Sequence, residues 1–255
     1  MAYKIMIDAG HGGRDPGAVY NGRQEKDDVL ALALAVGQIL EDSGLDVEYT
    51  RTTDIYESPG EKAREANNAG ADFFVSIHRN SFPRPNEVSG VETLVYDKSG
   101  IKNEMAENVN QRLENIGFRN LGVKERPNLT VLRRTQMPAI LVEAGFINSD
   151  IDNQLFDDNF QAIAQGIAGG ILDTLDIGPD GTMGMVYTIQ TGAFRNEDYA
   201  RTMLDRLLSQ NYPAFISEGN GYHRVQVGSF GTLEEARVIE RRLRQNGYPT
   251  AIIAG

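Results

Sequence analysis

The chain has 255 residues, of which 40% are hydrophobic and 24% are charged, and its formal net charge is −11. This composition is typical of soluble globular proteins and argues against fibrous or disordered chains, and the length suits a catalytic-sized domain joined to a small module. Because neutralising nucleic acid phosphates requires clustered Lys and Arg, which this acidic sequence lacks, we expect no nucleic acid partner.

The first part of the chain predicts strands that alternate with helices. Runs of apolar residues predict strands, and apolar residues at spacings of three and four predict helices. In chain order, the expected strands are residues 3–9, 46–51, 72–78, 90–97 and 139–146, and the expected helices are residues 27–44, 60–70, 103–117 and 159–175. This alternation is typical of an α/β fold with a mostly parallel sheet flanked by helices.

A change in composition after Leu175 indicates a domain boundary. The segment IGPDGTMGM is rich in turn-forming residues and has no apolar period. We therefore expect a first domain over residues 1–176, a linker over residues 177–185 and a second domain over residues 186–255.

The second domain contains an internal repeat in which residues recur 36 positions later. The matching residues are Gln190, Gly192, Phe194, Ala200, Leu207, Tyr212 and Pro213 in the first half, and Gln226, Gly228, Phe230, Ala236, Leu243, Tyr248 and Pro249 in the second. Each half predicts a strand, an amphipathic helix and a second strand. Because two copies are too few for a solenoid, we expect one closed ferredoxin-like α+β domain with the order βαββαβ.

Two of the three histidines follow predicted strands at comparable positions. The sequence has no cysteine, so a bound metal must use His, Asp or Glu. His11 and His78 end the strands predicted over residues 3–9 and 72–78, and the C-terminal ends of parallel strands form the crevice in which ligands bind. The pair therefore indicates a metal site, although an isolated histidine at a strand end is more often a loop residue that forms hydrogen bonds.

Two glutamates complete a candidate hydrolytic site. Zinc in hydrolases takes three N or O ligands, and Glu25 lies in the Gly-containing loop that returns from His11 to the helix over residues 27–44. Its alternative role is that of a solvated residue at a helix N-terminus. Glu143 ends a buried apolar strand, where it could act as a general base; the alternative is a structural ion pair with Arg51 or Arg133.

The segments DAGHGGRDPGA, SIHRN and LVEAGFINS and the Glu25 loop resemble the zinc-dependent N-acetylmuramoyl-L-alanine amidases of bacteria and their phages, over residues 3–175. The resemblance implies Zn²⁺ bound by His11, Glu25 and His78, with Glu143 as the catalytic residue. It also implies hydrolysis of the peptidoglycan amide that joins N-acetylmuramic acid to the L-alanine of the stem peptide.

Three further polar residues near these motifs are candidates for the pocket. Arg51 ends the second predicted strand and is expected to contact an acidic group of the substrate or to hold Glu143. Asn80 follows His78 and is expected to contact the substrate. Arg79 stands where the amidases more often carry a small residue, so we expect it to alter the rim of the pocket.

The repeated segments YTIQTGAF, YHRVQVGSF, YPAFI and YPTAII resemble the sporulation-related repeat (SPOR) domain, a peptidoglycan-binding module. The resemblance implies binding to glycan strands stripped of their stem peptides, which are the product of an amidase. We expect Gln190, Gln226 and Arg224 on the exposed sheet to contact this glycan. His223 is expected to be a surface contact and not a metal ligand, because no acidic residue or histidine is predicted near it.

Alternatives to the amidase activity remain at this stage. The same residues would suit a zinc peptidase that cuts within the stem peptide, or both domains could only bind wall polymer. The N-terminus MAYKIMIDAG lacks the features of a secretion signal, and no run of about 18 apolar residues predicts a membrane span. We therefore expect a protein that is cytoplasmic at synthesis and acts on the cell wall after release, as a phage endolysin or a mother-cell lytic enzyme.

Overall fold

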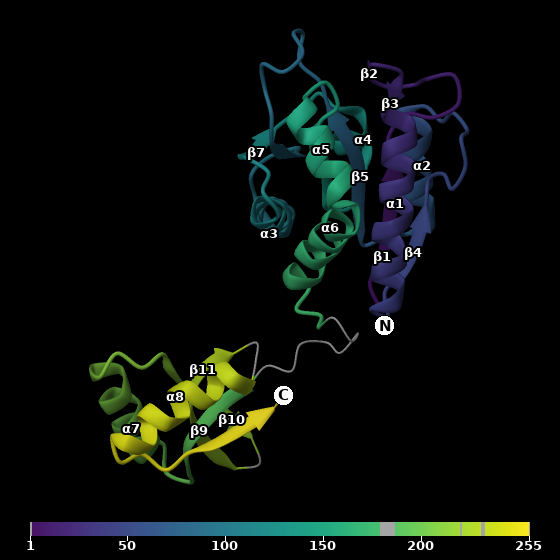
Figure 1. Ribbon diagram of the computed structural model, residues 1–255. Coiled ribbons are helices and arrows are strands. Elements are labelled where there is room, and N and C mark those ends of the chain that lie inside the picture. Colours follow the sequence, from purple (N-terminus) through teal and green to yellow (C-terminus); the bar gives the residue numbers. More distant parts are fainter. Residues whose placement is uncertain (1, 179–186, 220, 231–232, 255) are drawn as a thin grey trace. The chain divides into compact units, whose positions relative to one another are not determined.

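The computed structural model describes residues 2–178, 187–219, 221–230 and 233–254. It divides into two compact units, residues 1–182 and 183–255, which are described separately (Figure 1). Most of the linker predicted over residues 177–185 lies outside the described residues. Within the described ranges, no helix has the length and apolar character needed to cross a membrane.

The first unit is built on a six-stranded sheet with the strand order β4-β1-β5-β8-β6-β7. The strands are β1 (Lys4–Ala9), β4 (Asp46–Tyr49), β5 (Phe73–Asn80), β6 (Val91–Val95), β7 (Asn120–Glu125) and β8 (Ala139–Phe146). All neighbouring strands are parallel except β6 and β8, which are antiparallel. The predicted α/β fold with a mostly parallel sheet is therefore confirmed.

Helices cover both faces of this sheet. They are α1 (Glu25–Asp42), α2 (Pro59–Ala69), α3 (Gly100–Ile116), α4 (Thr130–Arg134), α5 (Asp150–Asp158) and α6 (Phe160–Thr174). Helix α6 packs against both α1 and α3 (Figure 1). The start of α2 is fixed by a capping box, in which Ser58 and Glu61 exchange hydrogen bonds between side chain and backbone.

Several short elements of the first unit were missed by the sequence patterns. They are β7, the helices α4 and α5, and the hairpin formed by β2 (Val19–Tyr20) and β3 (Arg23–Gln24). Strand β7 lies at the edge of the sheet, is only partly buried, and contains Asn120 and Gly122. An edge strand of this kind has no continuous apolar run, which is the signal that identified the central strands.

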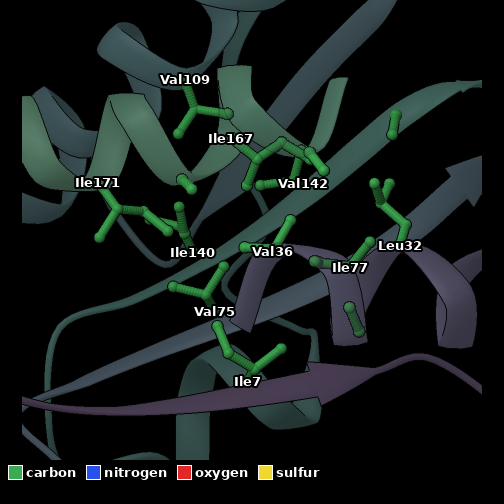
Figure 2. Close-up of a cluster of buried hydrophobic side chains, with 14 of the residues drawn as sticks. Ile7, Leu32, Val36, Val75, Ile77, Val109, Ile140, Val142, Ile167 and Ile171 are labelled. Atoms are coloured by element: carbon green, nitrogen blue, oxygen red, sulfur yellow. The ribbon is translucent and has the colours of Figure 1, made fainter. Parts of the chain in front are cut away.

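Two apolar clusters divide the interior of the first unit. The larger cluster lies between the sheet and the helices α1, α3 and α6, and Figure 2 labels Ile7, Leu32, Val36, Val75, Ile77, Val109, Ile140, Val142, Ile167 and Ile171. The smaller cluster includes Met6, Phe74 and Leu141 from the sheet with residues of α2 and α4.

The smaller cluster gives way to polar side chains toward the C-terminal ends of the strands. Side chains alternate along a strand, so residues two positions apart share a face of the sheet. Asp8 follows Met6 by two positions on β1, and Glu143 follows Leu141 by two positions on β8. Ser76 and His78 follow Phe74 by two and four positions on β5. These four polar side chains therefore lie on the same face as the smaller cluster. This face, covered by α2 and α4, carries the candidate chemistry.

The second unit has the predicted order βαββαβ. Its elements are β9 (Tyr187–Phe194), α7 (Glu197–Ser209), β10 (Ala214–Gly219), β11 (Tyr222–Phe230), α8 (Leu233–Gln245) and β12 (Ala251–Ala254). The sheet order is β10-β11-β9-β12, with all pairs antiparallel. Equivalent residues of the two repeats share one core. In it the rings of Tyr212 and Tyr248 pack edge to face, with 6.3 Å between the ring centroids.

Replacing Ile167 by Ala should lower the free energy of unfolding by about 2–5 kcal/mol, because truncation of a fully buried side chain leaves a cavity. The matched control is Ile151→Ala on α5, where the side chain is 67% exposed and the change should stay within about 0.5 kcal/mol. Urea denaturation followed by circular dichroism measures both. Equal losses in the two variants would contradict this assignment of the core.

Candidate metal centre and active site

Three potential metal ligands from separate elements meet at one edge of the sheet. His11 follows β1, Glu25 is the first residue of α1, and His78 lies on β5; one ligand atom of each lies within 4.8 Å of the others. Glu25 Oε2 is 3.1 Å from His11 Nε2, and Glu25 Oε1 is 2.9 Å from His78 Nδ1. Two imidazole nitrogens and one carboxylate oxygen form a ligand set that suits zinc in hydrolases.

The Glu25 carboxylate is buried and held by the backbone. Its exposed fraction is 4%, and it accepts hydrogen bonds from the backbone N–H groups of Ala18 and Arg79. Burial alone would raise the pKa of Glu25, but its interactions with His11 and His78 lower it below its ordinary value. The alternative of a solvated residue at a helix N-terminus is therefore wrong, although Glu25 does begin α1.

Glycines in the motif make room for these side chains. A Cβ on Gly10 would lie 2.3 Å from the ring of His78. A Cβ on Gly17 would lie 2.6 Å from the ring of His11 and 2.7 Å from Glu25 Oε2, and Gly17 has a φ of +66°, which other residues rarely adopt. The glycine-rich segment therefore packs closely around the three potential ligands.

Asp15 orients His11 and was not predicted. Its Oδ2 is 2.9 Å from His11 Nδ1, and its Oδ1 accepts a hydrogen bond from the backbone N–H of Gly17. A carboxylate on one ring nitrogen fixes the tautomer of a metal-binding histidine and leaves the other nitrogen, here Nε2, for the metal. The signal available in the sequence was an acidic residue four positions after His11.

Glu143 lies next to His78 on the neighbouring strand. It occupies β8 in register with His78 on β5, and its Oε2 is buried without a hydrogen-bond partner among the described residues. Burial raises the pKa of Glu143 to about 7; His78 opposes this rise, and the carboxylates of Glu25 and Glu92 add to it. The ion pair with Arg51 or Arg133 that was considered from the sequence is therefore wrong.

A cavity of about 260 Å³ opens beside the histidines. His11 and His78 line it together with residues of α2 and the segment 128–131, and Asp8, Lys62 and Leu141 also contribute. A larger cavity of about 390 Å³ lies elsewhere, between α1, α3 and α6, and has no group of potential metal ligands among the described residues. The smaller cavity is therefore the one that adjoins the candidate chemistry.

Two arginines that were expected at the pocket are buried among other groups of the protein. Arg51 is buried and donates hydrogen bonds to four backbone carbonyls, those of residues 9, 10, 26 and 53, so it holds the His11 loop. Among the described residues it does not pair with Glu143, and the substrate contact expected for it stays a prediction. Arg79 is buried between Asp28, which accepts its hydrogen bond at 2.7 Å, and the ring of Phe156. Arg79 therefore does not reach the rim of the pocket.

Asn80 directs its side chain toward a neighbouring carboxylate. Its Nδ2 donates to Glu92 at 3.1 Å, and its Oδ1 accepts from the backbone N–H of Ser81. Lys124 also forms an ion pair with Glu92. The substrate contact expected for Asn80 stays a prediction.

The expected glycan-contacting residues of the second unit share the face opposite its core. Gln190 and Gln226 lie opposite each other on β9 and β11, and Phe215 on β10, which is 41% exposed, lies opposite Gln226. Arg224 lies on the same strand and donates to the carbonyl of Gly219. The neighbouring residues Ile189, Val225 and Val227 point into the core, so the alternating residues face away from it.

The expectation that no acidic residue lies near His223 is wrong. Glu218 stands opposite His223 in the pairing of β10 with β11, and its carboxylate is 3.4 Å from His223 Nδ1. The repeat pattern did not reveal this contact because it depends on the register of the hairpin.

Comparisons with known proteins match both units. The sequence profile described as N-acetylmuramoyl-L-alanine amidase matches residues 5–173, and that of the SPOR domain matches residues 186–254. The sporulation-specific N-acetylmuramoyl-L-alanine amidase of Bacillus subtilis (strain 168) is 36% identical over 219 residues, which cover 84% of this chain and 84% of the relative. The endolysin of Bacillus phage SPP1 is 37% identical over 187 residues, which cover 69% of this chain and 68% of the relative.

Solved structures of similar sequence share the fold of the first unit. The N-acetylmuramoyl-L-alanine amidase of Clostridium difficile 630 aligns with a TM-score of 0.65 and 36% identity, covering 69% of this chain and 97% of that chain. The catalytic domain of CwlV, an N-acetylmuramoyl-L-alanine amidase from Bacillus (Paenibacillus) polymyxa var. colistinus, aligns with a TM-score of 0.63 and 35% identity, covering 69% and 99%.

Replacing Asp15 by Asn should weaken zinc binding by about 10–100-fold, because His11 loses the carboxylate that orients its ring. The control is Asp173→Asn on α6, which removes a partly exposed carboxylate that pairs with Arg112 and contacts no histidine; its zinc affinity should not change. Competition with a chromophoric chelator measures both. An Asp15→Asn variant with the zinc affinity of the unmodified protein would contradict the role given to Asp15.

Proposed function

The chain belongs to the N-acetylmuramoyl-L-alanine amidase family, and from this premise we propose that it is a zinc-dependent enzyme. Zinc is held by His11, Glu25 and His78, and Glu143 is the catalytic base. The reaction is hydrolysis of the amide between N-acetylmuramic acid and the L-alanine of the stem peptide. The observation that carries the proposal is the convergence of these three potential ligands beside a buried carboxylate oxygen without a partner.

The donor set fits zinc and leaves room for a substrate. Two imidazoles and one carboxylate converge from three parts of the chain. The two histidines also line the adjoining cavity of about 260 Å³, which is open to a substrate. Zinc bound there supplies a Lewis acid that polarises the scissile carbonyl and lowers the pKa of water.

Glu143 moves the proton in this scheme. Its Oε2 has no hydrogen-bond partner within the described part of the chain, so it is free to accept a proton from the attacking water. The same carboxyl group then donates the proton to the departing nitrogen of L-alanine. Burial raises the pKa of this carboxyl group, so it takes up a proton more readily than an exposed glutamate does.

We further propose that the second unit binds glycan strands stripped of their stem peptides. Phe215, Gln226 and Gln190 form a row across three strands on the face away from the core. An exposed aromatic ring beside two amides suits a sugar chain, which offers hydroxyl groups for hydrogen bonds and a flat ring face for stacking. Because the two units share one chain, binding to this product would raise the local concentration of uncleaved wall around the enzyme.

Replacing Glu143 by Gln should lower kcat for peptidoglycan at least about 100-fold while zinc affinity stays unchanged, because the amide cannot accept the proton. The readout is mass spectrometry of digested cell walls, where the unmodified enzyme should release peptides with a free N-terminal L-alanine and leave muramic acid intact.

Two controls make this experiment decisive. Glu65→Gln changes an exposed carboxylate on α2 and should leave kcat unchanged. Removal of zinc with a chelator should abolish hydrolysis, and added zinc should restore it. Full activity of Glu143→Gln with metal bound would refute the mechanism, and cleavage within the stem peptide would favour a zinc peptidase.

Replacing Gln190 and Gln226 together by Ala should weaken binding of the full chain to purified stripped glycan by about tenfold, because two hydrogen-bonding side chains leave the exposed face. Cosedimentation with glycan measures the affinity. Arg201→Ala on α7 is the control, since this exposed residue lies on a helix that packs against the core face. Equal binding by all three proteins would contradict the assignment of this face.

A further inference from the structure

A buried ion pair near the candidate metal ligands has no part in the proposed reaction. Asp8 on β1 is 1% exposed and Lys62 on α2 is 3% exposed. Lys62 Nζ donates to Asp8 Oδ1 at 2.7 Å. A buried ion pair is a weak source of stability, because removing two charges from water costs about as much as their attraction returns. Asp8 lies three residues before His11, so the pair can affect the position of that histidine.

The Asp8 carboxylate joins three strands and a helix. Besides Lys62 of α2, it accepts hydrogen bonds from Thr50 Oγ1 at 2.7 Å and from Ser76 Oγ at 2.6 Å. Thr50 directly follows β4, and Ser76 lies on β5 two residues before His78. Burial alone would raise the pKa of Asp8, but the charge and hydrogen bond of Lys62 lower it. Asp8 is therefore an ionised acceptor that ties β1 to both neighbouring strands.

Lys62 also holds the backbone that leads into His11. Its Nζ donates to the carbonyl of Ala9 at 2.6 Å, and Arg51 donates to the carbonyls of Ala9 and Gly10 at 3.1 and 2.7 Å. His11 follows with a φ of +57°, in the left-handed region that residues other than glycine rarely adopt. Such a conformation persists only where surrounding contacts determine it, and here two buried cations supply them.

We propose that Asp8 and Lys62 are positioning residues that set the separation of His11 and His78 and thereby the zinc affinity and the rate of hydrolysis. Asp8 acts on β5 through Ser76, and Lys62 acts on the His11 turn through Ala9. This inference rests on the proposed zinc-dependent function. It predicts that removing both charges weakens zinc binding even in a variant whose Tm stays close to that of the unmodified protein.

The test compares the variants Asp8→Asn and Lys62→Met with the double variant that carries both. Each single change leaves an unpaired buried charge or donor and should lower Tm strongly, whereas the double variant removes both charges and should recover most of the loss. The double variant should still bind zinc about tenfold or more weakly, because the links to Ser76 and Ala9 are weakened. In the full chain, kcat should fall while KM changes little.

Conservative and matched variants keep the test independent of folding. Lys62→Arg retains the positive charge in a different shape, so it should weaken zinc binding less than Lys62→Met does. Ser76→Ala removes one link without changing any charge and should weaken zinc binding by a smaller factor. The control is the double variant Arg112→Met and Asp173→Asn, which removes a partly exposed ion pair of 2.6 Å between α3 and α6 that contacts no candidate metal ligand, and it should leave zinc affinity unchanged.

Three outcomes are decisive. Zinc affinity and kcat of the Asp8 and Lys62 double variant equal to those of the unmodified protein would overturn the inference and leave the pair a purely structural role. Equal losses in the Arg112 and Asp173 control would overturn it as well. Failure of the unmodified protein to bind zinc would instead overturn the proposed function, so the two failures are distinguishable.

Discussion

The candidate site depends on one buried carboxylate that contacts two imidazoles. Glu25 lies between His11 and His78, and its oxygens also accept backbone hydrogen bonds. An anion in this position is costly to bury unless donors or a cation surround it. The surrounding features follow from this requirement: glycines leave space for the rings, Asp15 orients one of them, and buried cations hold the turn that carries His11.

The two faces of the six-stranded sheet have different roles: one packs the main core, and the other carries the candidate site. Its face toward α1, α3 and α6 holds the larger apolar cluster, while the face toward α2 and α4 is apolar only in part and becomes polar toward the strand ends. Parallel strands direct their C-terminal ends to one edge, which brings His78 and Glu143 into register on adjacent strands. The second unit repeats this division, with a shared core on one face of its sheet and amides on the other.

The sequence predicted the fold class and the side chains that meet at the site, because apolar runs locate strand ends and the histidines follow two of them. It did not predict the contacts that hold them. Asp8, Asp15 and Lys62 act through hydrogen bonds that no periodic pattern records. The hydrogen bonds of Arg51 were not predicted because charged residues are usually exposed, whereas here four carbonyls accept hydrogen bonds from a buried guanidinium.

X-ray absorption at the zinc edge of the zinc-loaded full chain tests whether His11, Glu25 and His78 share one ion. We predict one zinc per chain with only N and O ligands, including two imidazoles, and the loss of one imidazole contribution in His78→Ala. A spectrum without imidazole ligands, or one that His78→Ala leaves unchanged, would contradict the convergence of His11, Glu25 and His78 on a single ion.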